Sequence, residues 1–481
     1  MKILFVSPEI SPFAKTGGLA DVAQALPEAL SAQGHDIRTV MPKYLSIAEQ
    51  NLAMEHVASF TVQMHNGLRG ALLLHAKNGS VPTYFIENDA YFNREGLYGQ
   101  GDGDYPDNLE RFVFFCKVVL ECCKTIDFLP DVIHCNDWQT AALPGILKAT
   151  YAAYRKDPFF SPVPKLVYTI HNISYQGRFP EDHWPILSLP RSYYTHDFEF
   201  YGQINLTKSA IHLADAITTV SETYAREIRT TDLGFGLQEV LQRRQENLFG
   251  ILNGVDYREW SPETDPHAYG IHYSADNLAG KSQIKTRLQQ EYGLPDRDDV
   301  PLIGMITRLV EQKGIDLIAE CAEQILKLDT QMIVLGSGDP SYHNYFEWLQ
   351  RSYPDKVCIY IGYNNELAHK IEAGADIFLM PSLFEPCGLN QIYSLKYGTL
   401  PIVRLTGGLA DTIEDGVNGF TFFDFKPSFF FDSVKRAVDI YRNHPEMWKQ
   451  MMIAAMGQDY SWERSAEKYI AVYDKVLDKT V

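Results

Sequence analysis

The sequence lacks the features that mark several classes of protein. Its seven cysteines are odd in number and none stands in a C-x-x-C pair, so we expect neither a disulfide framework nor a zinc site. It contains no run of about 18 uncharged apolar residues, so no helix is expected to span a bilayer. Met1 leads directly into a strand-like segment without a targeting sequence, and we expect a cytoplasmic protein.

Basic residues are also fewer than acidic residues in the sequence. The 481 residues include 43 Lys and Arg against 61 Asp and Glu, which gives a formal net charge of −18. Nucleic acids and anionic membranes are bound by basic surfaces, so neither is an expected partner. An anionic ligand would instead be bound by a few local cations or by the N-terminus of a helix.

The sequence does contain enough apolar material for a large core. Hydrophobic residues make up 45% of the chain and aromatic residues 12%, which excludes intrinsic disorder and indicates two or three domains. Short apolar runs alternate with helical patterns, which is typical of parallel α/β architecture. The runs fall into two successive sets and predict two Rossmann-like domains. The first set comprises residues 3–7, 132–135, 165–169 and 216–220, and the second 302–306, 331–335, 377–380 and 400–403.

The boundary between the two sets is marked by a turn-rich stretch, residues 249–266, so we place a hinge near residue 250. The last segment, residues 460–477, has the apolar spacing of an amphipathic helix. Its predicted buried face consists of Trp462, Tyr469, Tyr473 and Val476. From this pattern alone, the helix could pack on the second domain or return to the first.

Two glycine-rich turns share the hexapeptide Thr-Gly-Gly-Leu-Ala-Asp, at residues 16–21 and 406–411. Paired glycines let backbone N–H groups approach a ligand closely, and the positive end of a following helix favours an anion. Lys15 adds a cation to the first turn. Either turn could also be an ordinary tight turn, because neither fits the Walker pattern or the dinucleotide fingerprint. Together the two copies suggest glycine-rich turns that face a shared cleft.

Charged residues follow two strands of the second set. Arg308 and Lys313 come after the run 302–306 and could bind one diphosphate, unless they are simply exposed loop cations. Glu385 follows the run 377–380 and precedes Pro386, which favours an extended conformation for Glu385; the alternative is a carboxylate that only stabilises its own helix. Open α/β sheets bind ligands at the carboxyl ends of their strands, where these residues lie.

In the first set, Asp137 and His171 also follow strands. One such residue is usually structural, but two at carboxyl ends point to the same crevice. Cys387 has no histidine in its segment, so a catalytic cysteine has little support. No cluster of histidine, cysteine and carboxylate residues has the spacing of metal ligands, and no metal is expected.

Taken together, four motifs resemble the family of bacterial glycogen synthases and plant starch synthases. They lie at residues 15–21, 168–172, 307–314 and 384–389, and the resemblance runs collinearly from residue 1 to about 478. It implies a GT-B fold, with two Rossmann-like domains across a deep cleft, no metal or cofactor, and a C-terminal helix that returns to the first domain. The implied ranges are 1–249 completed by 459–481, and 250–458.

The resemblance implies retaining transfer of glucose from ADP-glucose to the non-reducing 4-OH of an α-1,4-glucan, with glycogen or a malto-oligosaccharide as acceptor. Arg308 and Lys313 match the family's phosphate-binding pair, and Glu385 its sugar-binding carboxylate. The implied catalytic set is Glu385, Arg308, Lys313 and His171. The implied substrate-binding set is Lys15, Gly17, Gly18, Asp21, Asp137, Asn253, Tyr363, Cys387, Gly388 and Leu389, with Tyr363 expected to pack on the adenine.

One position departs from the wider fold family: many retaining GT-B enzymes have a second glutamate where this chain has Tyr393, a departure that the bacterial synthases share. The retaining mechanism stays open between front-face attack and a covalent intermediate on Glu385. Three alternative functions also remain. They are a phosphorylase with a pyridoxal phosphate lysine, transfer from a UDP-sugar as in sucrose synthase, and a glucan-binding module without turnover.

Overall fold

The computed structural model describes residues 1–76, 80–101, 103–154 and 157–478, without the side chains of 152–154. Parts of the expected domain ranges, at 77–79, 102, 155–156 and 479–481, lie outside the described residues. The chain divides into two compact units. Unit 1 comprises Met1–Gly254 with Trp462–Val481, and unit 2 comprises Val255–Ser461.

Unit 1 is built on a nine-stranded sheet in the order β14-β13-β9-β8-β1-β2-β5-β4-β3. Strands β14 to β5 of this order pair in parallel, as the apolar runs predict. The order reverses between β1 and β8, so the loops after these two strands are neighbours. The parallel strands are β1 (Lys2–Val6), β2 (Asp36–Pro42), β5 (Thr83–Glu87), β8 (Val132–Asn136), β9 (Lys165–Ile170), β13 (Ala216–Thr219) and β14 (Leu248–Gly250).

The expectation of parallel strands throughout is wrong at one edge of this sheet. Strand β3 (Met54–Met64) and strand β4 (Gly67–Ala76) form an antiparallel hairpin, and β4 pairs antiparallel with β5. The dipeptide Asn66-Gly67 lies at the turn, where Gly67 has a φ of 124°. An Asn-Gly pair between strand-like runs is a strong hairpin signal, and it could have revealed this element.

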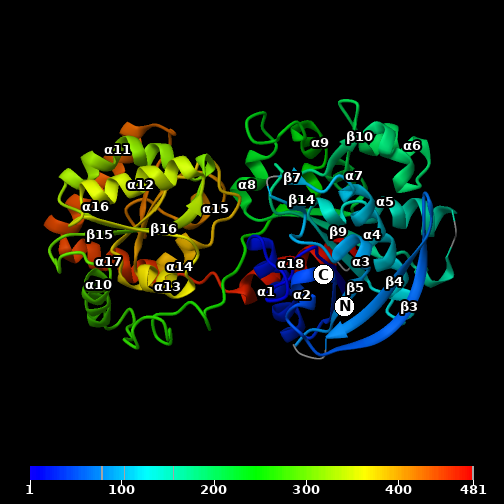
Figure 1. The fold of residues 1–481 in the computed structure, drawn as a ribbon, viewed down its shortest axis with the longest axis horizontal. Helices are drawn as coiled ribbons and strands as arrows, with labels where there is room; N and C mark the ends of the chain where they lie inside the picture. Colours follow the sequence, from blue (N-terminus) through cyan, green and yellow to red (C-terminus); the bar gives the residue numbers. More distant parts are fainter. Residues whose placement is uncertain (77–79, 102, 155–156, 479–481) are drawn as a thin grey trace. The chain divides into compact units, whose positions relative to one another are not determined.

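The C-terminal helix α18 (Trp462–Val476) belongs to unit 1. It lies against α1 (Gly18–Ala32), which follows β1, and the two are side by side in Figure 1. Of the predicted buried face, Trp462, Tyr469 and Tyr473 are buried, whereas Val476 is only half-buried. The fully buried His134 lies 2.8 Å from the Tyr473 hydroxyl through Nδ1, so the helix is attached to β8.

Unit 2 contains a six-stranded, fully parallel sheet in the order β17-β16-β15-β18-β19-β20. The strands are β15 (Leu302–Leu309), β16 (Gln331–Gly338), β17 (Val357–Ile361), β18 (Ile377–Met380), β19 (Leu400–Arg404) and β20 (Phe420–Phe422). The four predicted strand runs of the second set therefore become β15, β16, β18 and β19. This order is that of a doubly wound Rossmann sheet.

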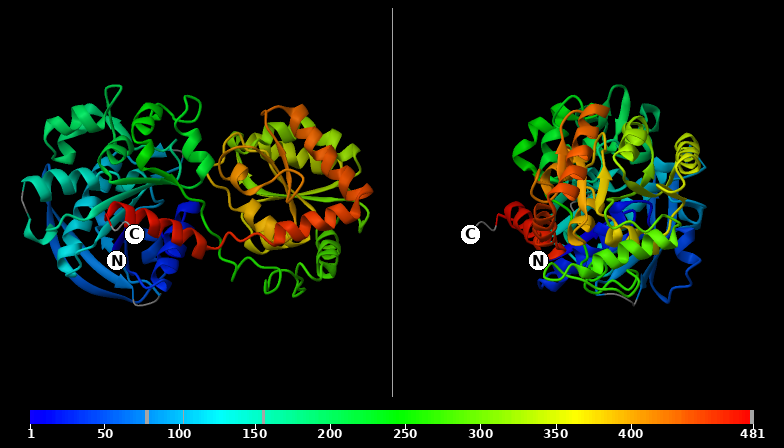
Figure 2. Two further views of the ribbon diagram at one scale, coloured as in Figure 1. Left: turned by 180° about the vertical axis from the view of Figure 1, so that it is seen from behind. Right: turned by 90° about the vertical axis from the view of Figure 1, so that its left-hand side faces the viewer.

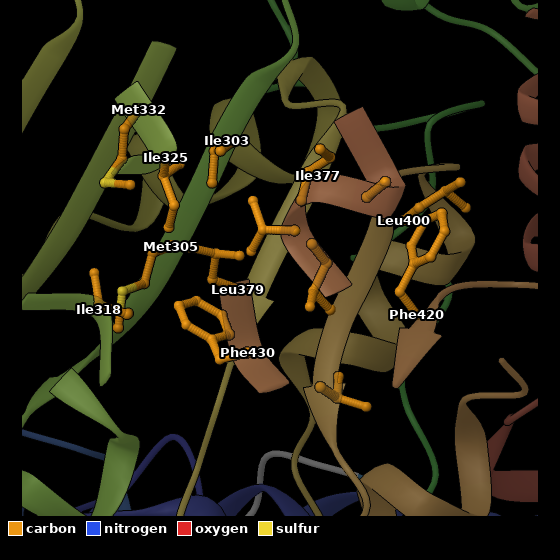
Figure 3. Packing of buried hydrophobic residues seen from close by; sticks show 14 of the residues in the cluster. Ile303, Met305, Ile318, Ile325, Met332, Ile377, Leu379, Leu400, Phe420 and Phe430 are labelled. Carbon is orange, nitrogen blue, oxygen red and sulfur yellow. The ribbon is translucent and has the colours of Figure 1, made fainter. Parts of the chain in front are cut away.

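Helices cover both faces of the unit 2 sheet, as Figures 1 and 2 show. One face packs against α11 (Ile315–Lys327), α12 (Pro340–Ser352) and α16 (Pro427–Asn443). The other packs against α10 (Ala279–Glu291) and α13 (Asn365–Gly374). Figure 3 shows the core between strands and helices on the first face, where Met305 and Leu379 meet Phe430. Because a sheet buried on both faces is rigid, it holds the loops at its carboxyl ends in place.

Candidate active site

The site of unit 2 lies where its strand order reverses. From β15 the chain adds β16 and β17 on one side of the sheet, and then β18, β19 and β20 on the other. Open parallel sheets bind ligands at the carboxyl ends of strands at such a point. Arg308 lies near the end of β15, and Glu385 lies in the loop after β18. Both side chains line one cavity of about 190 Å³, together with Lys313, Gly388 and Leu389.

The centre of this cavity is an ion pair. Lys313 Nζ donates to Glu385 Oε2 at 2.6 Å, and the Ser382 hydroxyl donates to the same oxygen at 3.0 Å. The two charged side chains are 17% and 8% exposed. Oε1 of Glu385 has no hydrogen-bond partner in the described part of the chain. One carboxylate oxygen is therefore held by protein, while the other can accept from a ligand hydroxyl.

Arg308 differs from Lys313 in its surroundings. Its side chain is exposed and forms no ion pair with any carboxylate of the described residues. Five guanidinium donors therefore stand at the cavity wall without a protein anion to neutralise them. An unpaired cation at the end of a strand is suited to an anionic ligand such as a diphosphate.

The loop that carries Glu385 is braced by backbone packing on the second glycine hexapeptide. A Cβ added to Gly407 would lie 1.8 Å from the Glu385 carbonyl oxygen, and one added to Gly408 would lie 2.0 Å from that of Cys387. Gly408 N donates to the Glu385 carbonyl at 3.2 Å. Residues 385–387 therefore fill the space into which a side chain at either glycine would extend.

The other predicted site residues of unit 2 differ in how they lie relative to the cavity. Cys387 is 6% exposed and lies below the surface of the loop, whereas Gly388 lines the cavity with a φ of 73° that favours glycine. Tyr363 follows β17, is 86% exposed and does not line the cavity. Its ring is therefore open to a planar ligand group.

In unit 1, Asp137 and His171 are brought together at the ends of β8 and β9. Asp137 Oδ1 accepts from His171 N at 2.8 Å, and Asp137 has a φ of 56°, unusual for a residue other than glycine. Burial raises the pKa of Asp137 to about 7. Burial lowers the pKa of His171 to about 3, and its Nε2 lies 3.0 Å from Asn136 Oδ1. The imidazole is therefore neutral near pH 7 and can serve as a hydrogen-bonding group.

The first glycine turn has surroundings opposite to those of the second. A Cβ added to Gly17 or Gly18 would meet no atom within 4 Å, and both residues are exposed at the start of α1. Lys15 Nζ forms an exposed ion pair with Asp21 Oδ1 at 2.7 Å. The turn therefore presents open backbone next to a helix N-terminus.

Asn253, the other predicted contact in unit 1, is 6% exposed. Its Oδ1 is buried and has no hydrogen-bond partner among the described residues. A buried polar atom without a partner costs free energy, so it is a candidate for a ligand contact.

Comparisons with known proteins show which family the chain resembles. Residues 2–243 match the family model of the starch synthase catalytic domain, and residues 287–451 match that of glycosyl transferases group 1. The chain is 44% identical to a glycogen synthase of Syntrophotalea carbinolica and 46% identical to glycogen synthase 2 of Geobacter sulfurreducens, with 99% of each chain covered in both cases. The chain belongs to the glycogen synthase family.

Solved structures place the family in its fold. The catalytic domain of starch synthase IV from Arabidopsis thaliana, bound to ADP and acarbose, superposes with a TM-score of 0.88 at 31% identity, covering 99% of each chain. A sucrose-phosphate synthase of Thermosynechococcus elongatus, with a TM-score of 0.60 and 16% identity, shares the fold alone. The protein is thus a glycosyltransferase with the GT-B fold and two Rossmann-like domains, as predicted.

At Tyr393, where many GT-B enzymes have a glutamate, the structure shows an aromatic stack that the sequence analysis missed. The Tyr393 ring lies 4.1 Å from that of Trp260 at an interplanar angle of 8°, and the opposite contact of Trp260 is His369 at 3.8 Å and 9°. Asp265 Oδ2 lies 2.9 Å from His369 Nδ1. Because these residues come from three distant segments, no local pattern predicts the stack.

Neither a metal site nor a membrane-spanning helix is found in the described ranges. No group of three or more histidine, cysteine, aspartate or glutamate side chains there could hold a metal ion. None of the helices in those ranges has the length and apolarity needed to cross a membrane. All seven cysteines lie within the described residues and are free thiols.

Proposed function

We propose that the protein transfers glucose from ADP-glucose to the non-reducing 4-OH of an α-1,4-glucan, with glycogen or a malto-oligosaccharide as acceptor and retention of the α configuration. The observation that carries this proposal is the cavity at the switch point of unit 2, where Arg308 stands beside the Lys313–Glu385 pair. Membership of the glycogen synthase family supports it, as does the likeness to a starch synthase bound to ADP and acarbose.

The chemical problem in this reaction is the departure of a nucleoside diphosphate. Negative charge grows on the β-phosphate as the glycosidic bond breaks, and preorganised cations stabilise that charge. In this proposal Arg308 binds the diphosphate as a two-pronged donor, and Lys313 binds it as a point charge. No protein carboxylate competes for Arg308 in the described chain, so its charge is available to the ligand.

Glu385 is assigned to the glucose hydroxyls rather than to nucleophilic attack. Its Oε2 already accepts from Lys313 and Ser382, so the lone pairs of this oxygen are engaged by protein donors. An ion-paired carboxylate is a weak nucleophile, and this supports front-face attack over a covalent intermediate. The acceptor hydroxyl then gives its proton to the departing phosphate while the two cations balance the charge. Gly388 and Leu389 complete the wall of the sugar site, and the backbone at Cys387 supports it.

Residues of unit 1 are assigned by the same reasoning. We propose that residues 1–249 with 459–481 form the acceptor-side domain, and residues 250–458 the nucleotide-sugar domain. Neutral His171 and the unpartnered Asn253 Oδ1 would hydrogen-bond sugar hydroxyls. Asp137 and Asp21 would contact the sugar or acceptor, and Lys15 with the backbone of Gly17 and Gly18 would bind an anionic oxygen of the donor. Tyr363 would pack on the adenine.

The test is a paired assay with purified protein and glycogen primer, given either ADP-glucose or UDP-glucose. Release of nucleoside diphosphate and incorporation of labelled glucose are followed together. Turnover of ADP-glucose with one glucose incorporated per ADP released is expected. Preference for UDP-glucose would move the protein to another donor class, and no turnover with either donor would favour a binding module. Absorbance of a yellow cofactor in the purified protein would favour the phosphorylase alternative.

A further inference from the structure

Glu9 is a buried carboxylate that the sequence analysis did not single out. It lies in the loop after β1 and is 3% exposed. Its carboxylate accepts three hydrogen bonds of 2.6 Å: Thr16 N donates to Oε2, and the hydroxyls of Thr16 and Tyr98 donate to Oε1. No lysine, arginine or histidine in the described chain forms an ion pair with it. The burial of the carboxylate is therefore compensated by these three donors.

The backbone of Glu9 is itself fixed. The Ser7 hydroxyl donates to the Glu9 carbonyl at 2.6 Å, and Glu9 N donates to Ser7 Oγ at 3.3 Å. Ser7 N in turn donates to the Val40 carbonyl of β2 at 3.1 Å. The backbone of Glu9 is thus tied through Ser7 to the central strand β2.

What Glu9 holds is the first glycine turn. Thr16 immediately precedes Gly17 and Gly18, whose open backbone has no atom within 4 Å of an added Cβ. The other side-chain attachment of this turn is the exposed Lys15–Asp21 pair, and exposed pairs contribute little rigidity. Both bonds from Thr16 to Glu9 are short, at 2.6 Å, and partly buried, so they fix the direction of the chain as it enters the glycines.

The third bond links this turn to a second part of unit 1. Tyr98 lies before α4 (Asn108–Thr125), and its ring packs against Phe112 of that helix and against Trp138. Trp138 directly follows Asp137. One carboxylate therefore joins the glycine turn, the segment of Tyr98 and, through aromatic contact, the neighbourhood of Asp137.

We propose that Glu9 is a positioning residue for the donor-binding turn: its carboxylate holds Thr16 so that the backbone N–H groups of Gly17 and Gly18 are preorganised for an anionic oxygen of the nucleotide sugar. This inference rests on the proposed function of the turn. Glu9 does not itself touch the substrate, because its oxygens are occupied by Thr16 and Tyr98.

The proposed role of Glu9 depends on its hydrogen bonds rather than on its charge. Glu9→Gln and Glu9→Ala should therefore differ in their effects. A glutamine can accept from Thr16 N through Oε1 and donate through Nε2 to the two hydroxyls, which can act as acceptors. Glu9→Gln therefore keeps the three contacts and loses only the charge. Glu9→Ala leaves Thr16 N and two hydroxyls without partners, and Thr16→Val removes one of the two bonds from the turn itself.

The experiment measures kcat and the KM values for ADP-glucose and for maltoheptaose in these variants. Glu9→Ala is expected to raise the KM for ADP-glucose about tenfold or more and that for maltoheptaose less than about twofold, with Thr16→Val intermediate and Glu9→Gln within about threefold of the native enzyme. Tyr91→Phe is a control for these variants, because it removes a hydroxyl that donates to a different carboxylate of unit 1, Glu110, at 2.7 Å.

Several outcomes would overturn the proposal. Equal loss in Glu9→Gln and Glu9→Ala would mean that charge matters rather than geometry. If Glu9→Ala has a lower kcat and a lower thermal stability but an unchanged KM for ADP-glucose, Glu9 stabilises the fold and does not position the turn. If Glu9→Ala does not fold, Thr16→Val decides, and an unchanged KM there contradicts the idea. Failure of the proposed function is a separate result, seen as no turnover of ADP-glucose by the native enzyme.

Discussion

At the residue scale, the two cations of the unit 2 cavity stand in different electrostatic surroundings. Lys313 is mostly buried and paired with Glu385, whereas Arg308 is exposed and has no carboxylate partner among the described residues. If both cations bind the diphosphate as proposed, the charge of Lys313 serves the fold as well as the ligand, and the charge of Arg308 serves the ligand alone. The sequence predicted that both cations lie at a strand end, but their spacing could not indicate this division.

Alanine substitution separates the two roles. Arg308→Ala and Lys313→Ala should each lower kcat by roughly 100- to 1,000-fold, about 3 to 4 kcal/mol, because each removes one preorganised donor from the diphosphate. Only Lys313→Ala should also lower the free energy of unfolding, by about 1 to 3 kcal/mol, because Glu385 then stays buried without its partner. Steady-state kinetics measure the loss of kcat, and denaturant unfolding measures the loss of the free energy of unfolding. A kcat loss under tenfold would remove either residue from the phosphate role.

Tyr393 illustrates a residue whose role depends on long-range packing. Substituting the glutamate that many GT-B enzymes carry, Tyr393→Glu, should destabilise the protein by about 0.5 to 1.5 kcal/mol, because the stack on Trp260 is lost. Tyr393→Phe keeps the ring and is the matched control. The measurement is chemical unfolding followed by tryptophan fluorescence, and equal stability of the two variants would contradict the stacking argument.

At the element scale, one hexapeptide has two structural uses. Both copies begin a helix after a strand, α1 in unit 1 and α15 (Gly407–Thr412) in unit 2. The glycines of the first copy meet open space, whereas those of the second lie against backbone oxygens of residues 385–387. Local sequence predicts the turn in each case. What fills the space above it depends on a loop about 20 residues away in the chain, which local sequence does not encode.

Replacing a glycine of the hexapeptide by alanine is therefore expected to have different consequences in the two copies. Gly407→Ala should displace the Glu385 loop and lower activity at least about tenfold, because its Cβ would lie 1.8 Å from the Glu385 carbonyl oxygen. Gly17→Ala should leave thermal stability within about 1 kcal/mol of the native value. If the turn binds the donor, this variant should raise the KM for ADP-glucose. Thermal melts and kinetics test the pair, and native-like activity of Gly407→Ala would contradict the bracing role.

The elements also show which parts of the fold were predictable. Eight parallel strands were predicted, because strands covered on both faces are continuous apolar runs, whereas the parallel strands β2, β5, β14, β17 and β20 were not. The hairpin of β3 and β4 was missed because much of β3 is exposed and its sequence is mixed in polarity. Glu9 was missed because a single carboxylate in a loop has no distinguishing spacing. Its importance comes from Thr16 and Tyr98, which reach it only in the folded chain.

At the scale of the whole molecule, unit 2 contains a buried polar cluster whose members do not line its cavity. Glu372 of α13 is fully buried; Ser394 donates to its Oε2 at 2.6 Å, and its Oε1 has no hydrogen-bond partner in the described part of the chain. Burial raises the pKa of Glu372 to about 8. Lys281, which donates to Ala373 O and to Thr399 Oγ1, has its pKa lowered to about 7 by burial. Near pH 7 Glu372 therefore favours its neutral form, whereas the charged and neutral forms of Lys281 are about equally populated.

This cluster makes the stability of the fold depend on pH. The folded pKa of Glu372 lies above the ordinary value of 4.5 for a glutamate, so between these values the native state keeps a proton that the unfolded state releases. The contribution of Glu372 is present below pH 4.5 and is lost as pH rises towards 8. Glu372→Gln, which mimics the protonated form, should gain stability relative to the native protein by at least about 1 kcal/mol between pH 5.5 and pH 8.

Calorimetric or denaturant unfolding of both proteins at several pH values measures this difference. Glu320→Gln is the matched control, because Glu320 is an exposed carboxylate in the same unit, on α11. Its substitution controls for the loss of one carboxylate from the same unit. A pH-independent difference for Glu372→Gln would mean that Glu372 is ionised in the folded protein. Lys281 would then have to be the charged partner that stabilises it.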